Sequence, residues 1–208
     1  MKLYLSSYKI GDNMEELKGL MSASNKKMGY IPNALDFTGA YSERRKKHIQ
    51  SDMDSLEHLG FEVEELDLRN YFNKQKELKS KLDTLGGIWV SGGNTFVLRQ
   101  AMRLSGMDEI VKQLASRKDF LYGGYSAGCC VLSSSLKAYA IVDDATDTPY
   151  QELKETIWDG LGLIDYAFLP HFESDHPESV DVSKEVEFCI KNNIPFKTIS
   201  DGEVIIVQ

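Results

Sequence analysis

The sequence predicts an α/β fold in which a mostly parallel sheet has helices on both faces, a three-layer, doubly wound arrangement. Strand-like segments alternate along the chain with amphipathic segments typical of helices, and this order favours parallel strands. Residues 87–91, Gly-Ile-Trp-Val-Ser, form a nearly continuous apolar run, which indicates a strand buried on both faces. A chain of 208 residues is long enough to bury such a core without disulfides or metal.

Strands are expected where short apolar or alternating runs end at turn residues. Pro32 stops the second of them because proline cannot donate to a strand ladder. The last two strands are expected to form a closing hairpin around Asp201 and Gly202. The expected strands cover residues 2–6, 28–31, 61–68, 87–91, 119–122, 138–142, 162–170, 196–200 and 203–207.

Helices are expected where apolar residues recur every three or four positions. Ser42 is a suitable N-cap for the second helix, and Gly60 follows its end. In the last helix, Val182, Val186 and Phe188 or Cys189 are expected to face inward. The expected helices cover residues 13–21, 42–59, 74–82, 96–104, 107–116, a segment beginning at 127, and 178–192.

The composition excludes several classes of function. With 32 acidic and 24 basic residues the net charge is −8, which argues against nucleic acid or an anionic membrane as partner, because both attract clustered Lys and Arg. No run has the length of a membrane span or a secretion signal. Three cysteines, two of them adjacent, make no disulfide framework and favour a cytoplasmic location. A single domain over residues 1–208 is expected, as a monomer or a homodimer.

The most informative motif is Gly124-x-Ser126-x-Gly128. It stands where a strand-like run ends and a helix-like run begins, the position of a nucleophilic serine on a sharp strand-to-helix turn. Small neighbours allow the chain to turn without a clash, and the serine hydroxyl is lifted clear of the backbone. By itself the pattern also fits a glycine-rich turn with an exposed serine.

Two further motifs follow predicted strands, so they are expected at the same edge of the sheet. Residues 92–95, Gly-Gly-Asn-Thr, leave backbone N–H groups unobstructed for a phosphate or an oxyanion. Their spacing matches neither a dinucleotide-binding fingerprint nor a P-loop, which argues against phosphate. His171 follows Pro170 at the end of another strand, and a serine of ordinary pKa needs such a base to attack at neutral pH.

The other histidines carry less weight. His48 and His58 lie in a charged helix and are expected to be solvated, and His176 is expected in a loop. A metal site formed by His171, Asp175 and His176 is the weaker interpretation. We expect neither a metal nor a cofactor.

Together, the segments 92–96, 124–128 and 170–172 resemble the motifs of the peptidase E family, serine peptidases that include α-aspartyl dipeptidases and, more distantly, cyanophycinases. The motifs follow the family's order at similar spacing, and the similarity extends over nearly the whole chain. The resemblance implies the class I glutamine-amidotransferase-like (flavodoxin-like) variant of the doubly wound sheet. It also implies hydrolysis of short peptides without a metal.

The resemblance assigns a role to each motif. Ser126 would attack the scissile carbonyl, and His171 would take its proton and later give it to the leaving amine. The backbone N–H groups of Gly93 and Ala127 would stabilise the oxyanion.

The carboxylate that orients the histidine is left open. The Asn-Asp-Met-Pro segment that supplies it in dipeptidase members is absent, and Asp143 and Asp144 stand in that region. Glu173, two residues after the histidine, is a rival because it is similar to the His-x-Glu pairing of glutamine amidotransferases.

Substrate preference departs from the family pattern. Aspartyl dipeptidases hold the acidic side chain of the substrate with an arginine downstream of the histidine, whereas the last arginine here is Arg117. Lys184 does not reproduce a bidentate guanidinium. A strict preference for N-terminal aspartate is therefore not expected.

Two other interpretations remain. An α/β-hydrolase-type esterase also uses G-x-S-x-G, but the short separation of Ser126 from His171 and the lack of a His-Gly-Gly-Gly segment argue against it. A binding or regulatory protein with a decayed triad on the same scaffold is the other, motivated by the unassigned acid. Labelling of Ser126 by a fluorophosphonate distinguishes an enzyme from a binding protein.

Overall fold

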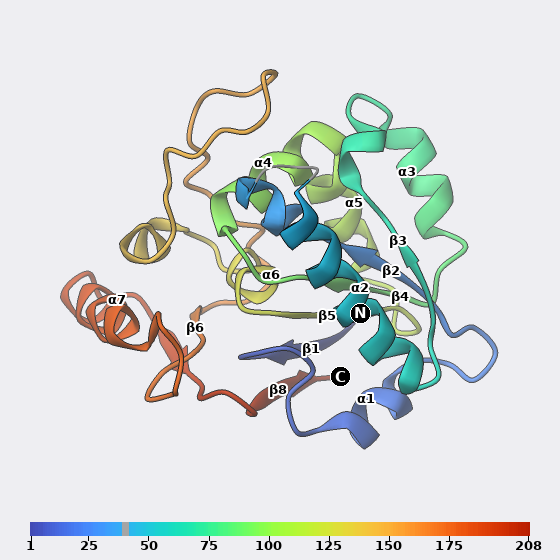
Figure 1. Cartoon of the computed structure of the whole chain (residues 1–208), viewed down its shortest axis with the longest axis horizontal. Coiled ribbons are helices and arrows are strands. Elements are labelled where there is room, and N and C mark those ends of the chain that lie inside the picture. Colours follow the sequence, from blue (N-terminus) through green and yellow to red (C-terminus); the bar gives the residue numbers. More distant parts are fainter. Residues whose placement is uncertain (39–41) are drawn as a thin grey trace.

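In the computed structural model, which describes residues 1–38 and 42–208, a six-stranded sheet is formed with strand order β3-β2-β4-β5-β1-β8 (Figure 1). All neighbouring strands are parallel except β8, which runs antiparallel to β1. The predicted mostly parallel α/β sheet is therefore confirmed. Its strands are β1 (Lys2–Ser6), β2 (Lys27–Ile31), β3 (Glu62–Glu65), β4 (Gly87–Val90), β5 (Leu121–Tyr125) and β8 (Val204–Val207).

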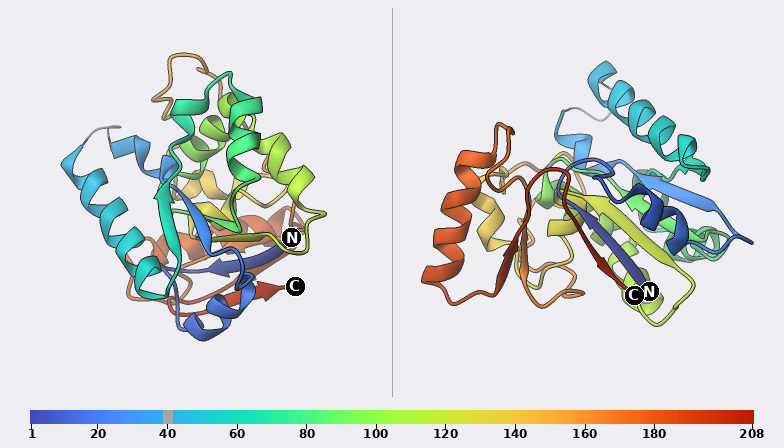
Figure 2. Two further views of the ribbon diagram at one scale, coloured as in Figure 1. Left: turned by 90° about the vertical axis from the view of Figure 1, so that its right-hand side faces the viewer. Right: turned by 90° about the horizontal axis from the view of Figure 1, so that it is seen from below.

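Helices cover both faces of this sheet (Figure 2). Strand β4 shows why: Ile88 and Val90 belong to the apolar core on one face, and Trp89 belongs to the core on the other. Because successive side chains of a strand point to opposite faces, an all-apolar strand needs cover on both sides. The Trp89 side is covered by α1 (Met14–Leu20) and α2 (Glu43–His58), and the other by α3 (Gln75–Leu82), α4 (Thr95–Ser105), α5 (Met107–Leu114) and α6 (Ala127–Cys130).

Polar side chains cap the N-termini of two helices, α2 and α4. Ser42 accepts a hydrogen bond from the backbone N–H of Arg45 and so caps α2, as predicted. Asn94 accepts from the N–H groups of Phe96 and Val97 and starts α4 directly after the Gly92-Gly93 turn. Among the described residues, no helix combines the length and the apolar character that crossing a membrane requires.

The chain between β5 and β8 forms a smaller unit beside the main sheet. Strand β6 (Ala167–Leu169) pairs in parallel with β7 (Phe196–Thr198), and the helix α7 (Ser179–Lys191) packs against β6. The predicted strand at 138–142 is wrong: residues Lys137–Ile141 form a 3-10 helix, η3, in which the N–H of Tyr139 bonds to the carbonyl of Leu136. Other 3-10 helices are η1 (Asn33–Thr38) and η2 (Leu68–Tyr71).

The predicted closing hairpin is also wrong. Strand β7 pairs with β6, and β8 pairs with β1, so the two strands on either side of Asp201 and Gly202 belong to different sheets. The turn itself is present, because the N–H of Glu203 donates to the carbonyl of Ser200. This turn carries the chain from the small sheet back to the main one.

Candidate active site

Ser126 stands at the junction of β5 and α6 with an unusual backbone conformation. Its φ of 47° and ψ of −119° lie in a region that residues with a Cβ rarely adopt. Such strain persists only where the surrounding structure enforces it, and it is concentrated at functional sites. The conformation is that of a nucleophile elbow.

The glycine two residues after Ser126 allows α6 to pack directly on strand β4. A Cβ added to Gly128 would lie 2.4 Å from the carbonyl oxygen of Val90, far inside van der Waals contact. Gly128 is thus required because the backbones of α6 and β4 pack closely at this point, directly after the sharp turn at Ser126.

This packing gives a stability prediction. We expect Gly128→Ala to destabilise the fold by about 2–4 kcal/mol, because backbone cannot give way to the added methyl group, and to lower any Ser126-dependent activity because the elbow must shift. Urea unfolding measures the change. Gly19→Ala is the matched control: it lies in α1 with nothing within 4 Å of the added Cβ, so it should be neutral or slightly stabilising. Equal stability of both variants would contradict the packing argument.

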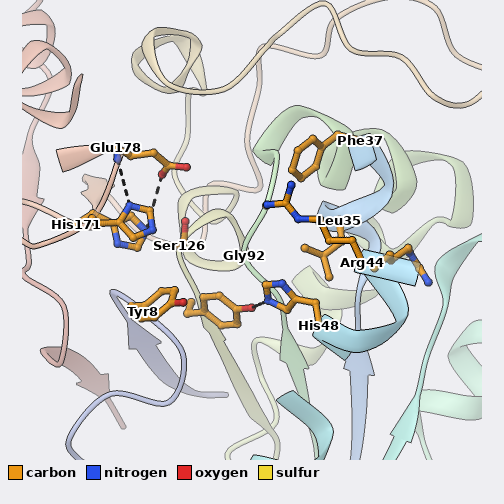
Figure 3. A pocket seen from close by; sticks show the side chains of 13 residues that line it. Tyr8, Leu35, Phe37, Arg44, His48, Gly92, Ser126, His171 and Glu178 are labelled. Carbon is orange, nitrogen blue, oxygen red and sulfur yellow. Dashed lines mark hydrogen bonds and ion pairs between the residues drawn. The ribbon is translucent and has the colours of Figure 1, made fainter. Parts of the chain in front are cut away.

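Ser126 opens onto a cleft of about 230 Å³ that several separate segments line (Figure 3). The loop after β1, the η1 region, the start of α2, the loop after β4, the elbow after β5 and the loop after β6 all reach it. These are the carboxyl ends of the parallel strands, where α/β sheets bind ligands. Its lining residues are Tyr8, Leu35, Phe37, Arg44, Arg45, His48, Gly92, Gly93, Tyr125, Ser126, His171, His176 and Glu178.

His171 reaches the same cleft from the loop after β6, and its ring is held by a carboxylate. Its Nδ1 donates a hydrogen bond of 2.7 Å to Oδ1 of Asp201. Ser7 ties the pair together, because its Oγ donates to the same oxygen at 2.8 Å and accepts from the backbone N–H of His171 at 2.8 Å. With the proton on Nδ1, the lone pair of Nε2 is available to act as a base.

The acids expected beside His171 lie elsewhere. Asp143 accepts a hydrogen bond of 2.8 Å from the backbone N–H of Thr95, at the start of α4. Asp144 accepts from Thr146. Glu173 is exposed and has a positive φ of 50°. Among the contacts of the described residues, Asp201 rather than any of these three bonds to His171, because the turn before β8 folds back over the loop after β6.

Two backbone N–H groups beside Ser126 are unused. In the described part of the chain, neither Gly93 nor Ala127 donates its N–H to a protein acceptor. Gly93 has a φ of 138°, and a Cβ there would lie 2.3 Å from the carbonyl oxygen of Ala34, so the loop can take this path only with glycine. Both donors are thus available to a ligand oxygen.

The environment of His171 favours its neutral form. Burial lowers its pKa from the ordinary value of 6.5, the neighbouring His176 lowers it further, and the hydrogen bond and charge of Asp201 oppose the shift. The two imidazole rings are stacked, with centroids 3.7 Å apart. Glu178 lies 4.0 Å from Nε2 of His171. These three residues are also close enough to one another to hold a metal ion.

The cleft contains groups that the sequence interpretation passed over. His48, expected to be solvated, lines the cleft and bonds to the hydroxyl of Tyr125 at 2.8 Å. Arg44, in the first turn of α2, also lines the cleft and is exposed. The family pattern predicts such an arginine after His171, whereas Arg44 lies well before it in the chain. The N-cap signal at Ser42 could have placed Arg44 near the sheet edge, because helices that follow parallel strands begin there.

Comparison with known proteins places the chain among peptidases. The profile of peptidase family S51 matches residues 6–208. A protein of Listeria monocytogenes named "Uncharacterized peptidase Lmo0363" is 32% identical over 162 residues, which are 77% of this chain and 74% of the relative. "Uncharacterized peptidase Lin0382" of Listeria innocua is 31% identical over 74% of this chain and 61% of its own length. The crystal structure of a "Putative Peptidase E Protein" from Listeria monocytogenes superposes with a TM-score of 0.75 at 27% identity, covering 100% of this chain and 98% of that one.

Proposed function

The chain belongs to peptidase family S51, a family of serine peptidases, and on that premise we propose that it hydrolyses short peptides with Ser126, His171 and Asp201 as its catalytic triad. The observation that carries the proposal is the strained serine on the floor of a cleft that it shares with a buried histidine, whose other nitrogen is bonded to a carboxylate. Nucleophilic acyl transfer uses a serine beside a base that a carboxylate orients. Ser126 and His171 line the same cleft, and substrate binding would have to bring the hydroxyl and Nε2 into hydrogen-bond contact.

In this mechanism, His171 takes the hydroxyl proton as Ser126 attacks the peptide carbonyl carbon. The resulting oxyanion accepts hydrogen bonds from the N–H groups of Gly93 and Ala127, both of which are free of protein acceptors among the described residues. His171 then gives its proton to the leaving amine, and water hydrolyses the acyl-enzyme by the same steps. Asp201 keeps the Nδ1 proton in place throughout and stabilises the imidazolium.

The cleft favours short peptides. Its free volume of about 230 Å³ is below the usual range of drug-sized ligand pockets, which leaves room for a short peptide but not for an extended one. Arg44, on the wall opposite His171 (Figure 3), can bind the carboxylate at the end of a short leaving group.

Two measurements test the proposal. A fluorophosphonate should label Ser126 in the folded wild-type protein and should not label the His171→Ala variant. A library of dipeptides and tripeptides, with free and amidated C-termini, should show cleavage by mass detection. An unlabelled serine together with an uncleaved library would favour a binding protein with this fold.

The histidine environment predicts the pH dependence. Because the pKa of His171 is lowered and the neutral ring is the active base, kcat/KM should rise with pH to a plateau, with its midpoint below 6.5. The groups facing the ring are Asp201, His176 and Glu178. His176→Ala should move the midpoint upward, because it removes burial and a neighbouring positive charge. A midpoint above 7 in the wild type would contradict this account.

A further inference from the structure

A second, narrower cavity adjoins the nucleophile. It shares Ser126, His171 and Glu178 with the open cleft and has a volume of about 20 Å³. Its other walls come from the start of α4, from α6, from η3 and from the inner face of α7. Neither Gly92 nor Gly93 lines it, so this cavity and the glycine loop contact Ser126 separately.

The inner face of α7 places a carboxyl group in this cavity. Val182, Glu185 and Cys189 are spaced three and four residues apart and are all buried. Glu185 is only 2% exposed and lines the cavity. Among the described residues, none hydrogen-bonds to it or forms an ion pair with it. Its oxygens are not fully enclosed by protein atoms, so they can bond to a group that enters the cavity.

Other carboxyl groups in the same cavity reinforce its negative character. Asp143 and Glu178 also line it, whereas no lysine or arginine of the described chain does. Burial raises the pKa of Asp143 to about 7. Burial, followed by the charges of Asp143 and Glu178, raises the pKa of Glu185 to about 9. Burial thus favours the protonated forms of both carboxyl groups, and a bound cation would displace those protons.

This inference rests on the proposed peptidase function. We propose that this cavity receives the end of the side chain of the residue whose carbonyl carbon Ser126 attacks, and that Glu185 and Asp143 select a side chain ending in an ammonium group. The side chain of that residue branches one atom away from the attacked carbon, so its pocket must open directly beside the serine hydroxyl. This cavity does so. Its free volume suits one water-sized group at the end, which fits an ammonium better than a guanidinium.

The kinetic test uses peptides that differ only at this residue. Ornithine should give a kcat/KM at least about tenfold above that of norleucine, its uncharged isostere, because charge-assisted hydrogen bonds are worth that much or more. Aspartate should be the poorest of the three. Glu185→Gln should lower the ornithine-to-norleucine ratio by about tenfold or more. The matched control is Glu187→Gln, at an exposed glutamate on the same helix, which should leave the ratio unchanged. A wild-type preference for aspartate or norleucine, or an unchanged ratio in Glu185→Gln, would overturn the pocket while leaving the peptidase function standing.

A binding test separates the two proposals. Calorimetry on the Ser126→Ala variant should show tighter binding of the ornithyl peptide than of the norleucyl peptide, and Glu185→Gln in that background should remove the difference. If this holds while the wild type cleaves no peptide, the pocket stands and the peptidase proposal falls. Equal binding of the two peptides, or no binding of either, would refute the pocket.

Discussion

Replacing Ser126 with alanine should lower turnover of any cleaved peptide by about 10⁴-fold or more, while the midpoint of thermal unfolding stays nearly unchanged. Turnover falls because His171 then has no hydroxyl to deprotonate. Stability is kept because the side chain of Ser126 hydrogen-bonds to none of the described residues and the backbone conformation is the same for alanine. Steady-state assays and thermal unfolding on the same preparations measure both quantities.

A second substitution tests the strained backbone conformation of Ser126. Ser126→Gly should be as inactive as Ser126→Ala, yet more stable by about 1 kcal/mol, because glycine adopts a φ of 47° with a ψ of −119° without strain. Ser134→Ala, at an exposed serine eight positions along the chain, is the control and should keep full activity. Retained turnover in Ser126→Ala would remove the central assignment.

The predicted elements that the structure confirms share one property: their signals are local. The apolar run of β4, the N-cap Ser42 and the glycines around Ser126 each depend on neighbours within a few positions. The three motifs were expected at one sheet edge because each follows a strand, and parallel strands end on the same side. Ser126 and His171 do line one cleft, as the order of strands and motifs predicts.

Asp201 was missed because a local signal pointed to another structure. Asp-Gly between two apolar runs is typical of a hairpin turn, and this interpretation gave the aspartate a purely structural role. Whether β7 pairs with β8 or with β6 is decided by tertiary packing, which separates the two strands into different sheets. The useful signal was present all the same: Asp201 follows a predicted strand, as Gly92, Ser126 and His171 do.

Asp143 shows the opposite error, in which spacing along the chain suggested a contact that the structure does not make. Residues before it form the 3-10 helix η3 instead of a strand, which directs the carboxylate toward the N–H of Thr95. Glu185 was missed for a related reason, since the apolar residues of α7 were used to choose its inner face. Glu185 lies on that face between Val182 and Cys189, and a charged residue contributes nothing to an apolar pattern.

The assignment of Asp201 leads to the second large effect: Asp201→Asn should lower kcat by about 10⁴-fold. An amide side chain can present its N–H₂ to the ring, so it stabilises the tautomer in which Nδ1 accepts and Nε2 carries the proton. A ring in that tautomer cannot take the proton of Ser126. The loss should therefore appear in the rate of acyl-enzyme formation, measured by a single-turnover burst, and not in peptide binding to the Ser126→Ala background.

The pH profile distinguishes an orienting carboxylate from one that only stabilises the loop. Asp201 raises the pKa of His171 against the effects of burial and of His176. Its removal should thus move the midpoint of any residual kcat/KM to lower pH, a shift that a merely unfolded or loosened loop would not give. Glu173→Gln is the matched control. Glu173 is exposed, and in the described part of the chain its carboxylate makes no hydrogen bond or ion pair with the ring of His171. Near-normal turnover in Asp201→Asn, with a large loss in Asp143→Asn or Glu173→Gln, would show that the catalytic acid had been assigned to the wrong residue.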